Sequence, residues 1–101
     1  MKPWWVTDFR KLRVWRAAQD FAVAVHLAAK DMNSLGSAKL ADQLTRAAAS
    51  VPANIVEGCS HDSLREFGRF LRYARASVTE AESHLELARE LRMISDSTSN
   101  V

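Results

Sequence analysis

Only three glycines and two prolines interrupt this chain of 101 residues. An all-β fold reverses direction often and uses such residues at its turns, so a chain with few of them favours long helices. Hydrophobic residues make up 48% of the sequence and charged residues 26%, which is typical of a globular domain and not of a disordered segment. At this length there is room for one domain with one modest core.

Apolar residues recur at steps of three and four over three stretches of the chain. This spacing places them on one face of an α-helix. It predicts helices over residues 12–32 and 38–57, and a third that follows Ser63 for roughly 30 residues. Helices joined by short connections run antiparallel. The sequence therefore predicts an all-α fold, an antiparallel up-down helical bundle with three helices.

Local sequence signals predict where the bundle domain and its helices begin and end. Residues 1–11 carry Pro3 and no helical period, so we expect an extended N-terminal arm before a bundle domain of residues 12–94, and residues 95–101 form a C-terminal tail. Gly36 is expected to end the first helix and Ser37 to cap the second. Gly58 is expected just past the end of the second helix, with a positive φ. Ser63 and Glu66 have the spacing of a capping box, in which each side chain bonds the other residue's backbone N–H.

The expected lengths of the helices leave part of the third one uncovered. A helix of roughly 30 residues is about 45 Å long, whereas two helices of about 20 residues reach only about 30 Å. The apolar stripe through Val78, Leu85 and Leu91 would then extend beyond its partners in the chain. We therefore expect another subunit to cover it.

The sequence offers no catalytic or metal site. Cys59 is the only cysteine, so it cannot form a disulfide within the chain, and it is best explained as a small buried hydrophobic residue in a reducing cytoplasm. Cys59 and His61 share a turn, but zinc needs more ligands than this pair supplies. There is no glycine-rich phosphate loop, nucleophile elbow, signal peptide or apolar run long enough to span a membrane. We expect a soluble cytoplasmic protein with no cofactor that binds and assembles and is not an enzyme.

Charge is distributed unevenly along the chain. Residues 1–78 carry 12 Lys and Arg against 7 Asp and Glu, whereas residues 79–101 carry 2 against 5. Basic residues cluster at the start of the first predicted helix and in the first half of the third, and these clusters form the candidate nucleic-acid-binding site. Its residues are Arg10, Lys11, Arg13, Arg16, Arg65, Arg69, Arg72 and Arg75.

Three interpretations of these basic residues stay open. Arg65, Arg69 and Arg72 share one stripe of a helix, and guanidinium groups pair well with phosphates. The same stripe could instead meet the acidic half of a neighbouring subunit, in a contact that closes into a ring. A charged face that is only solvated is the third interpretation. The nearby aromatic residues Phe67, Phe70 and Tyr73 are expected to belong to the core.

The stretch Ser50–Gly58, with the sequence SVPANIVEG, carries a resemblance to a known family. It resembles the signature of the bacterial 23S rRNA intervening-sequence proteins. Further matches before and after it extend the resemblance from Phe9 to Ile94. These matches are Phe9, Leu12, Trp15, Gln43-Leu44, Arg46-Ala47, Glu66-Phe67, Arg69-Phe70-Leu71, Ser77, Glu80 and Glu82, and the signature residues singled out are Pro52, Asn54, Glu57 and Gly58.

The resemblance implies an antiparallel four-helix bundle that assembles into a ring-shaped homo-oligomer, with five subunits as the number associated with the family. It also implies an association with nucleic acid, because a relative is a nucleic-acid-binding accessory to the reverse transcriptase of diversity-generating retroelements. The family pattern continues into a fourth helix after Ile94, which this sequence lacks. We expect either a truncated bundle or a neighbouring subunit in place of the missing helix.

The signature residues have structural explanations of their own. Pro52 lies inside the second predicted helix, where it removes an N–H and should kink the helix. The amide of Asn54 could satisfy a backbone group near that bend or contact a ligand. Glu57 lies at the negative end of the same helix, so a salt bridge to Arg65 or Arg69 is a better explanation than an acid–base role.

These observations lead to one leading hypothesis and one alternative. The leading hypothesis is a non-enzymatic homo-oligomeric bundle that binds RNA or DNA without sequence preference. The alternative is a structural or protein-partner scaffold whose charged faces serve only to assemble the oligomer.

Overall fold

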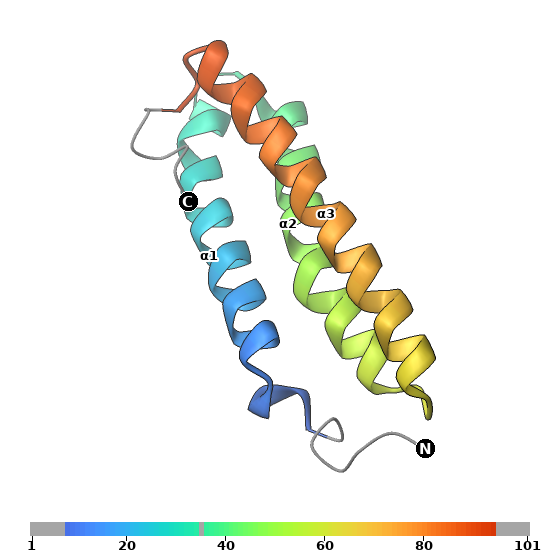
Figure 1. Ribbon diagram of the computed structural model, residues 1–101. Helices are drawn as coiled ribbons and strands as arrows, with labels where there is room; N and C mark the ends of the chain where they lie inside the picture. Colours follow the sequence, from blue (N-terminus) through green and yellow to red (C-terminus); the bar gives the residue numbers. More distant parts are fainter. Residues whose placement is uncertain (1–7, 35, 95–101) are drawn as a thin grey trace.

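The computed structural model describes residues 8–34 and 36–94. It contains a short 3-10 helix, η2 (Phe9–Lys11), and three α-helices, α1 (Arg13–Ser34), α2 (Ala38–Cys59) and α3 (Leu64–Glu90). The helices run up, down and up in an elongated bundle of 48 × 19 × 18 Å (Figure 1). The predicted all-α bundle of three helices is confirmed. The first seven residues of the predicted arm and the whole predicted tail lie outside the described residues.

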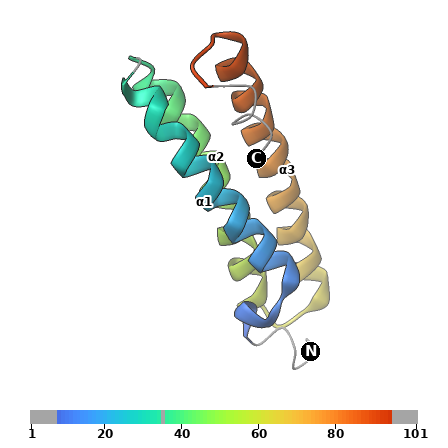
Figure 2. The same ribbon diagram turned by 90° about the vertical axis from the view of Figure 1, so that its left-hand side faces the viewer.

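The bundle has one open side. α2 packs along both α1 and α3, and these outer helices make their main contacts with α2 and not with each other. Figure 1 shows α1 on one side of α2 and α3 on the other, and Figure 2, a quarter turn away, shows α1 lying in front of α2 with α3 beside them. In a bundle built this way, none of the helices that the structure describes covers the side that faces away from α2.

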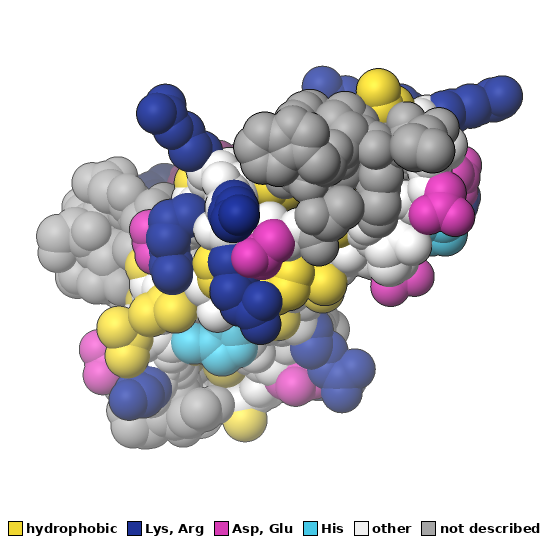
Figure 3. Space-filling view, turned by 90° about the horizontal axis from the view of Figure 1, so that it is seen from below, with side chains coloured by type: hydrophobic (Ala, Val, Ile, Leu, Met, Phe, Trp, Pro, Cys, Tyr) yellow, Lys and Arg dark blue, Asp and Glu magenta, His cyan; other side chains and the backbone are white. Residues whose placement is uncertain are grey.

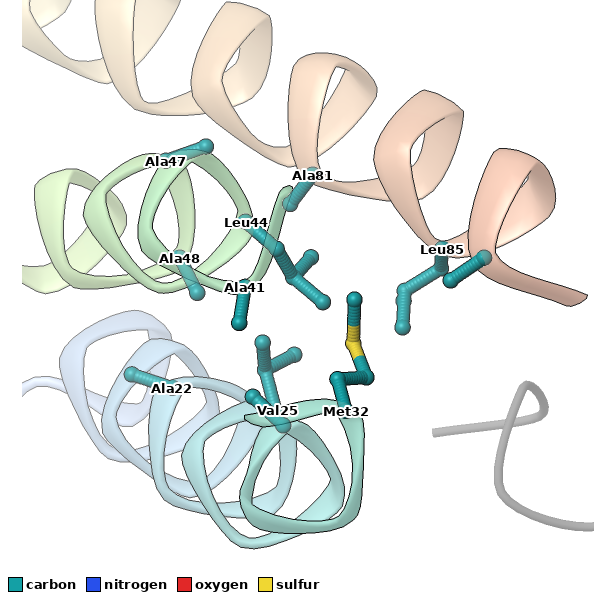
Figure 4. Close-up of a cluster of buried hydrophobic side chains, with 11 residues drawn as sticks. Ala22, Val25, Met32, Ala41, Leu44, Ala47, Ala48, Ala81 and Leu85 are labelled. Atoms are coloured by element: carbon teal, nitrogen blue, oxygen red, sulfur yellow. The ribbon is translucent and has the colours of Figure 1, made fainter. Parts of the chain in front are cut away.

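The core lies along α2 and is filled largely by small residues. In its upper half, Val25 and Met32 of α1 and Leu44 of α2 are fully buried. Figure 4 shows these side chains pointing toward one another and toward Leu85 of α3, with alanines around them. Alanine at these positions lets helices approach closely while the few larger side chains fill the space between them.

The third helix extends beyond its neighbours less than the sequence suggested. α3 has 27 residues, while α1 and α2 have 22 each. Leu85 is only 3% exposed because it packs in the cluster around Met32, and Val78 is partly buried against another cluster of the core. The expectation is therefore wrong for Leu85, whereas Val78 is only partly covered within the chain. Leu91 is 53% exposed, as expected.

The boundaries of the helices follow the predicted signals in part. Gly36 has the expected positive φ of 81°. Ser37, however, makes no side-chain cap to α2, because its hydroxyl donates to the carbonyl of Met32 at 2.5 Å and so closes the end of α1. The Ser63 hydroxyl accepts from the Glu66 N–H at 3.1 Å and caps α3 as predicted. The Glu66 carboxylate does not reach back, because it pairs with Arg69 instead.

Loss of the Ser63 cap should have a measurable cost. Ser63→Ala leaves one N–H in the first turn of α3 without its partner, and such caps contribute roughly 0.5–2 kcal/mol to stability. We expect the free energy of unfolding, measured by urea denaturation, to fall by about 1 kcal/mol. Ser60→Ala is a matched control, since the Ser60 hydroxyl donates to the Glu57 carbonyl at an exposed position. An equal loss in both variants would contradict a specific role for the cap.

Gly58 lies inside α2 and not beyond its end. The helix continues to Cys59, and the predicted positive φ at Gly58 is wrong. The reason for a glycine here is contact with α3: a Cβ at this position would lie 3.0 Å from Phe70 Cβ and 3.1 Å from Phe67 Cδ1. Both distances are shorter than ordinary van der Waals contact, so the helices can approach this closely only because Gly58 has no side chain.

Pro52 is buried, and α2 remains helical on both sides of it. Proline lacks an N–H, so the carbonyl of Ala48 has no helical partner. The Asn54 side-chain amide donates to the carbonyl of Ser50 at 2.8 Å, which confirms the predicted contact with a backbone group near the proline. The kink itself stays a prediction.

Candidate nucleic-acid interface

Topology brings both basic clusters to one end of the molecule. Because the chain reverses twice, α1 and α3 run in the same direction and begin at the same end (Figure 1). Phe9 and Leu12 pack with Phe67 and Leu71 in one apolar cluster, which fastens the start of the first helix to the third. We call this end of the bundle the basic end. Among the residues that the structure describes, its basic residues are the eight predicted ones: Arg10, Lys11, Arg13, Arg16, Arg65, Arg69, Arg72 and Arg75.

Aromatic rings contact two arginines of the basic cluster at the start of the first helix. The Asp8 side chain accepts from the Arg10 N–H at 3.1 Å and caps η2. Phe9 and Trp15 meet edge to face with ring centroids 5.1 Å apart. The Arg10 guanidinium lies 4.5 Å from the centre of the Phe9 ring, and the Arg16 guanidinium lies 5.0 Å from that of Trp15. Cation–π contacts of this kind hold guanidinium groups in place while leaving their N–H groups available.

Two of these arginines also have acidic neighbours. Arg10 Nη1 lies 3.6 Å from Asp8 Oδ1, and Arg16 Nη2 lies 2.9 Å from Asp20 Oδ1. All four side chains are largely exposed to solvent. Exposed ion pairs contribute little free energy, so a phosphate could displace these carboxylates at small cost.

Arg69 is engaged far more than the sequence indicated. Its Nη2 lies 2.7 Å from Glu66 Oε1, and its Nη1 donates to the Tyr73 hydroxyl at 2.9 Å. The guanidinium also lies over the rings of Phe70 and Tyr73. Hydrogen bonding between the two side chains lowers the pKa of Glu66 and raises the pKa of Arg69. Arg69 therefore stabilises the surface of α3 and is less available to a ligand than its neighbours.

The other basic residues of this end have no acidic partner. None of them has a carboxylate oxygen within 4.0 Å among residues 8–34 and 36–94, and each side chain is exposed. These five residues, which we call the unpaired cations, are Lys11, Arg13, Arg65, Arg72 and Arg75.

Glu57 does not form an ion pair with any of the unpaired cations. The predicted salt bridge from Glu57 to Arg65 or Arg69 is wrong, because Arg69 turns to Glu66 and Glu57 forms no ion pair with any residue that the structure describes. The Glu57 side chain is exposed, and its carbonyl accepts from the N–H and hydroxyl of Ser60. The corner between α2 and α3 is held by apolar packing of Gly58 against Phe67 and Phe70 instead.

The positive ends of two helix dipoles add to the charge of the basic end. α1 begins at Arg13 and α3 at Leu64, and the unbonded N–H groups of a first turn attract anions. Figure 3 looks onto this end and shows Lys and Arg side chains at its centre and edges, with hydrophobic surface between them. The C-terminal half of α3, by contrast, carries a net negative charge. It carries Glu80, Glu82, Glu86 and Glu90.

One candidate residue was missed in the sequence. Tyr73 was expected in the core, yet its side chain is 44% exposed beside Arg69. Phe70, which is partly buried, lies between Tyr73 and His61, whose ring stacks on it at a centroid distance of 5.1 Å. The position of Tyr73 four residues after Arg69, on the face away from the apolar stripe, is the signal that could have identified it.

A second feature lies on the open side of the bundle. It is a groove of about 500 Å³ between α1 and α3, with Val51 and Ile55 of α2 as its floor. Arg75 of the basic end lies on its rim and, within residues 8–34 and 36–94, is the one charged residue that lines it. We call it the α1/α3 groove. The remaining lining residues are Val14, Ala17, Ala18, Phe21, Leu71, Ala74 and Val78.

Neither metal chemistry nor a membrane span is visible in the described part of the chain. Residues 8–34 and 36–94 contain no group of three His, Cys, Asp or Glu placed to hold a metal ion. Cys59 is buried with Phe67, as the explanation of a small hydrophobic residue requires. Within the same residues, no helix combines the length and hydropathy that crossing a bilayer takes.

Comparisons with known proteins agree with the fold. No curated protein matches the chain. The model of one family, described as 23S rRNA-intervening sequence protein, matches residues 10–101, from the start of the basic end through all three helices. The match includes the stretch Ser50–Gly58, whose last residue packs closely against Phe67 and Phe70 of α3. Since it covers nearly the whole chain, the protein belongs to the 23S rRNA-intervening sequence protein family.

Proposed function

We propose that this protein is a non-enzymatic cytoplasmic homo-oligomer that binds RNA or DNA through the phosphate backbone at the basic end of the bundle. One observation carries the proposal: two segments far apart in sequence, η2 with the start of α1 and the first half of α3, bring eight basic side chains to one end, and five of these have no acidic partner among the described residues. Folding thus concentrates positive charge that the sequence distributes over two segments.

The chemistry of the basic end fits phosphate better than base edges. Guanidinium groups bind phosphate oxygens in a two-point geometry, and here several project from helical surfaces at different heights. A helix that reads bases must present polar side chains to the groove of a duplex in a fixed register. The basic end offers Arg and Lys almost alone, so its contacts should position the nucleic acid without reading its sequence.

The α1/α3 groove supports self-association. Val14 on its rim is 46% exposed, and Leu71, Phe21 and Val78 within it are only partly buried. Apolar surface that is open to solvent in this way is available to a neighbouring subunit. A ring of five subunits is the form that the family resemblance predicts.

The alternative function is a scaffold without a nucleic-acid ligand. The opposite charges of the two halves of α3 favour it, because the basic half of one subunit could meet the acidic half of the next. In that arrangement Arg65 and Arg72 would pair with carboxylates such as Glu80 of a neighbouring subunit and would have no role in binding phosphate.

Replacing two unpaired cations should weaken nucleic-acid binding to the same extent for every sequence. We expect the double variant Arg65→Gln/Arg72→Gln to bind a fluorescent RNA hairpin and unrelated DNA duplexes more weakly than the wild type. The slope of log affinity against log salt should flatten by about 0.9 for each duplex phosphate that the variant no longer neutralises. Fluorescence anisotropy at several salt concentrations measures both quantities.

A matched control removes the same charge elsewhere. Lys30→Gln/Lys39→Gln also removes two exposed positive charges, but these lie at the end of α1 and the start of α2, away from the basic end. We expect this variant to keep the wild-type salt slope. Equal weakening in both double variants would indicate a general effect of net charge. A wild type that binds no nucleic acid at low salt, with arginine variants that change the oligomer mass, would favour the scaffold.

A further inference from the structure

The Arg69 guanidinium group is held in one orientation by hydrogen bonds from each of its three nitrogens. Its Nε and Nη2 donate to Glu66 Oε1 at 3.2 and 2.7 Å, and its Nη1 donates to the Tyr73 hydroxyl at 2.9 Å. The edge that would bind a phosphate at two points is therefore engaged. The Arg69 side chain is nonetheless 42% exposed, so the surface that it offers to a ligand is mainly the flat face of the guanidinium group.

Aromatic rings lie against this guanidinium group. Its carbon is 5.4 Å from the centre of the Tyr73 ring and 5.0 Å from that of the Phe70 ring. Phe70 meets Tyr73 edge to face at a centroid distance of 5.4 Å, and His61 stacks on Phe70. These neighbours fix the positions of Arg69 and Tyr73, and Tyr73 is itself 44% exposed. We call Arg69 and Tyr73 together the α3 platform.

Two of the unpaired cations flank the α3 platform along the helix. Arg65 precedes Arg69 by four residues and Arg72 follows it by three, which places them about 6 Å and 4.5 Å away along the axis of α3. Both side chains are exposed. Arg72 Nη1 reaches back to 3.8 Å from the position that a Cβ on Gly68 would take, beside the platform. Positive charge that no carboxylate of the described residues neutralises thus lies on both sides of an exposed ring.

We infer that the α3 platform stacks an unpaired base of a single-stranded nucleic acid, while Arg65 and Arg72 bind the phosphates on either side of that base. This inference rests on the proposed function and deepens it, because it makes single-stranded RNA or DNA the ligand. Protein rings and guanidinium planes stack on bases that have a free face. In a duplex, neighbouring base pairs cover both faces, and taking a base out of the stack costs free energy. Since every base has a flat face, stacking adds affinity without sequence preference.

Tyr73→Leu tests the platform, because leucine keeps an apolar side chain but has no ring. We expect it to bind a short oligouridylate and a short oligothymidylate about tenfold more weakly than the wild type. Binding of a duplex of the same length should be unchanged. Tyr73→Phe is the matched control, since it keeps the ring and removes only the hydroxyl that Arg69 bonds. Its affinity for both strands should stay within about threefold of the wild type. Fluorescence anisotropy measures the affinities, and circular dichroism checks that the variants are folded.

A strand of abasic nucleotides tests the inference with the wild type alone, because it keeps the phosphates and lacks the bases. It should bind about tenfold more weakly than oligothymidylate, and Tyr73→Leu should not weaken it further. The inference would be overturned by equal wild-type affinity for the abasic and the complete strand, by tighter binding of the duplex than of either single strand, or by an equal loss for every ligand in Tyr73→Leu.

The same measurements separate this inference from the proposed function. If the platform fails these tests while Arg65→Gln/Arg72→Gln still weakens salt-dependent binding, the phosphate contacts of the basic end stand and only the stacking is disproved. A wild type that binds no nucleic acid at low salt would overturn both. If the inference holds, the more tightly bound of the two single strands identifies RNA or DNA as the ligand.

Discussion

Ile55→Asp should unfold the protein or leave it only marginally folded. Ile55 is 1% exposed and packs with Ala18, Val51 and Ala74, so a carboxylate there has no polar partner among the residues of this cluster. An unpaired charge in such surroundings costs several kcal/mol. The whole free energy of unfolding of a small domain is only about 5–15 kcal/mol. The expected result is a large fall in the midpoint of urea denaturation, followed by far-ultraviolet circular dichroism.

Ile55→Val separates the effect of charge from that of volume. It removes one methylene group from the same site, and such a change costs about 0.5–1.5 kcal/mol. The aspartate variant should therefore lose several times more stability than the valine variant. Similar losses in both would mean that the floor of the groove is more hydrated than the burial of Ile55 indicates.

Gly58→Ala should destabilise the protein although it replaces glycine by alanine inside a helix. Alanine would by itself favour α2 by up to about 1 kcal/mol. Its Cβ, however, would lie 3.0 Å from Phe70 Cβ, an atom next to the backbone that cannot move unless α3 moves. Overpacking of this kind costs about 1–3 kcal/mol, which exceeds the gain in helix propensity. The net loss should appear as a lower melting temperature.

Gly68→Ala provides the contrast. Gly68 lies in α3, and the nearest atom to its added Cβ would be Arg72 Nη1 at 3.8 Å, an ordinary contact with the end of a flexible side chain. Helix propensity alone then decides the effect on stability, and we expect the free energy of unfolding to rise by up to about 1 kcal/mol. The two glycine variants should thus shift the melting temperature in opposite directions. A gain at both positions would mean that α2 and α3 can separate slightly at no cost.

The structural features that were predicted correctly are those that depend on the order of residues along the chain. Hydrophobic periodicity gave the three helices, and local signals gave the positive φ of Gly36 and the cap at Ser63. These features follow from the backbone preferences of single residues and from spacings of three or four. The stretch Ser50–Gly58 indicated the family, which the match over residues 10–101 supports.

The sequence could not predict what depends on distances between helices. The role of Gly58 follows from the closeness of α2 to α3, which no period reveals. Glu66 had two reachable partners, the Ser63 N–H and Arg69, and only the side-chain geometry decides for Arg69. The uncovered surface was expected at the end of the third helix because helix lengths were the available guide. It lies instead between the outer helices, since Leu85 is covered by the cluster around Met32.

The central place of α2 limits how the sequence can diverge. Its buried alanines, Ala41, Ala47 and Ala48, belong to the core cluster that also contains residues of α1 and α3. A larger side chain on α2 therefore requires matching changes in more than one neighbouring helix, which single mutations rarely supply. The outward faces of α1 and α3 carry no such double constraint and can accept new residues one at a time. Evolutionary drift in this fold should therefore be slowest along its middle helix.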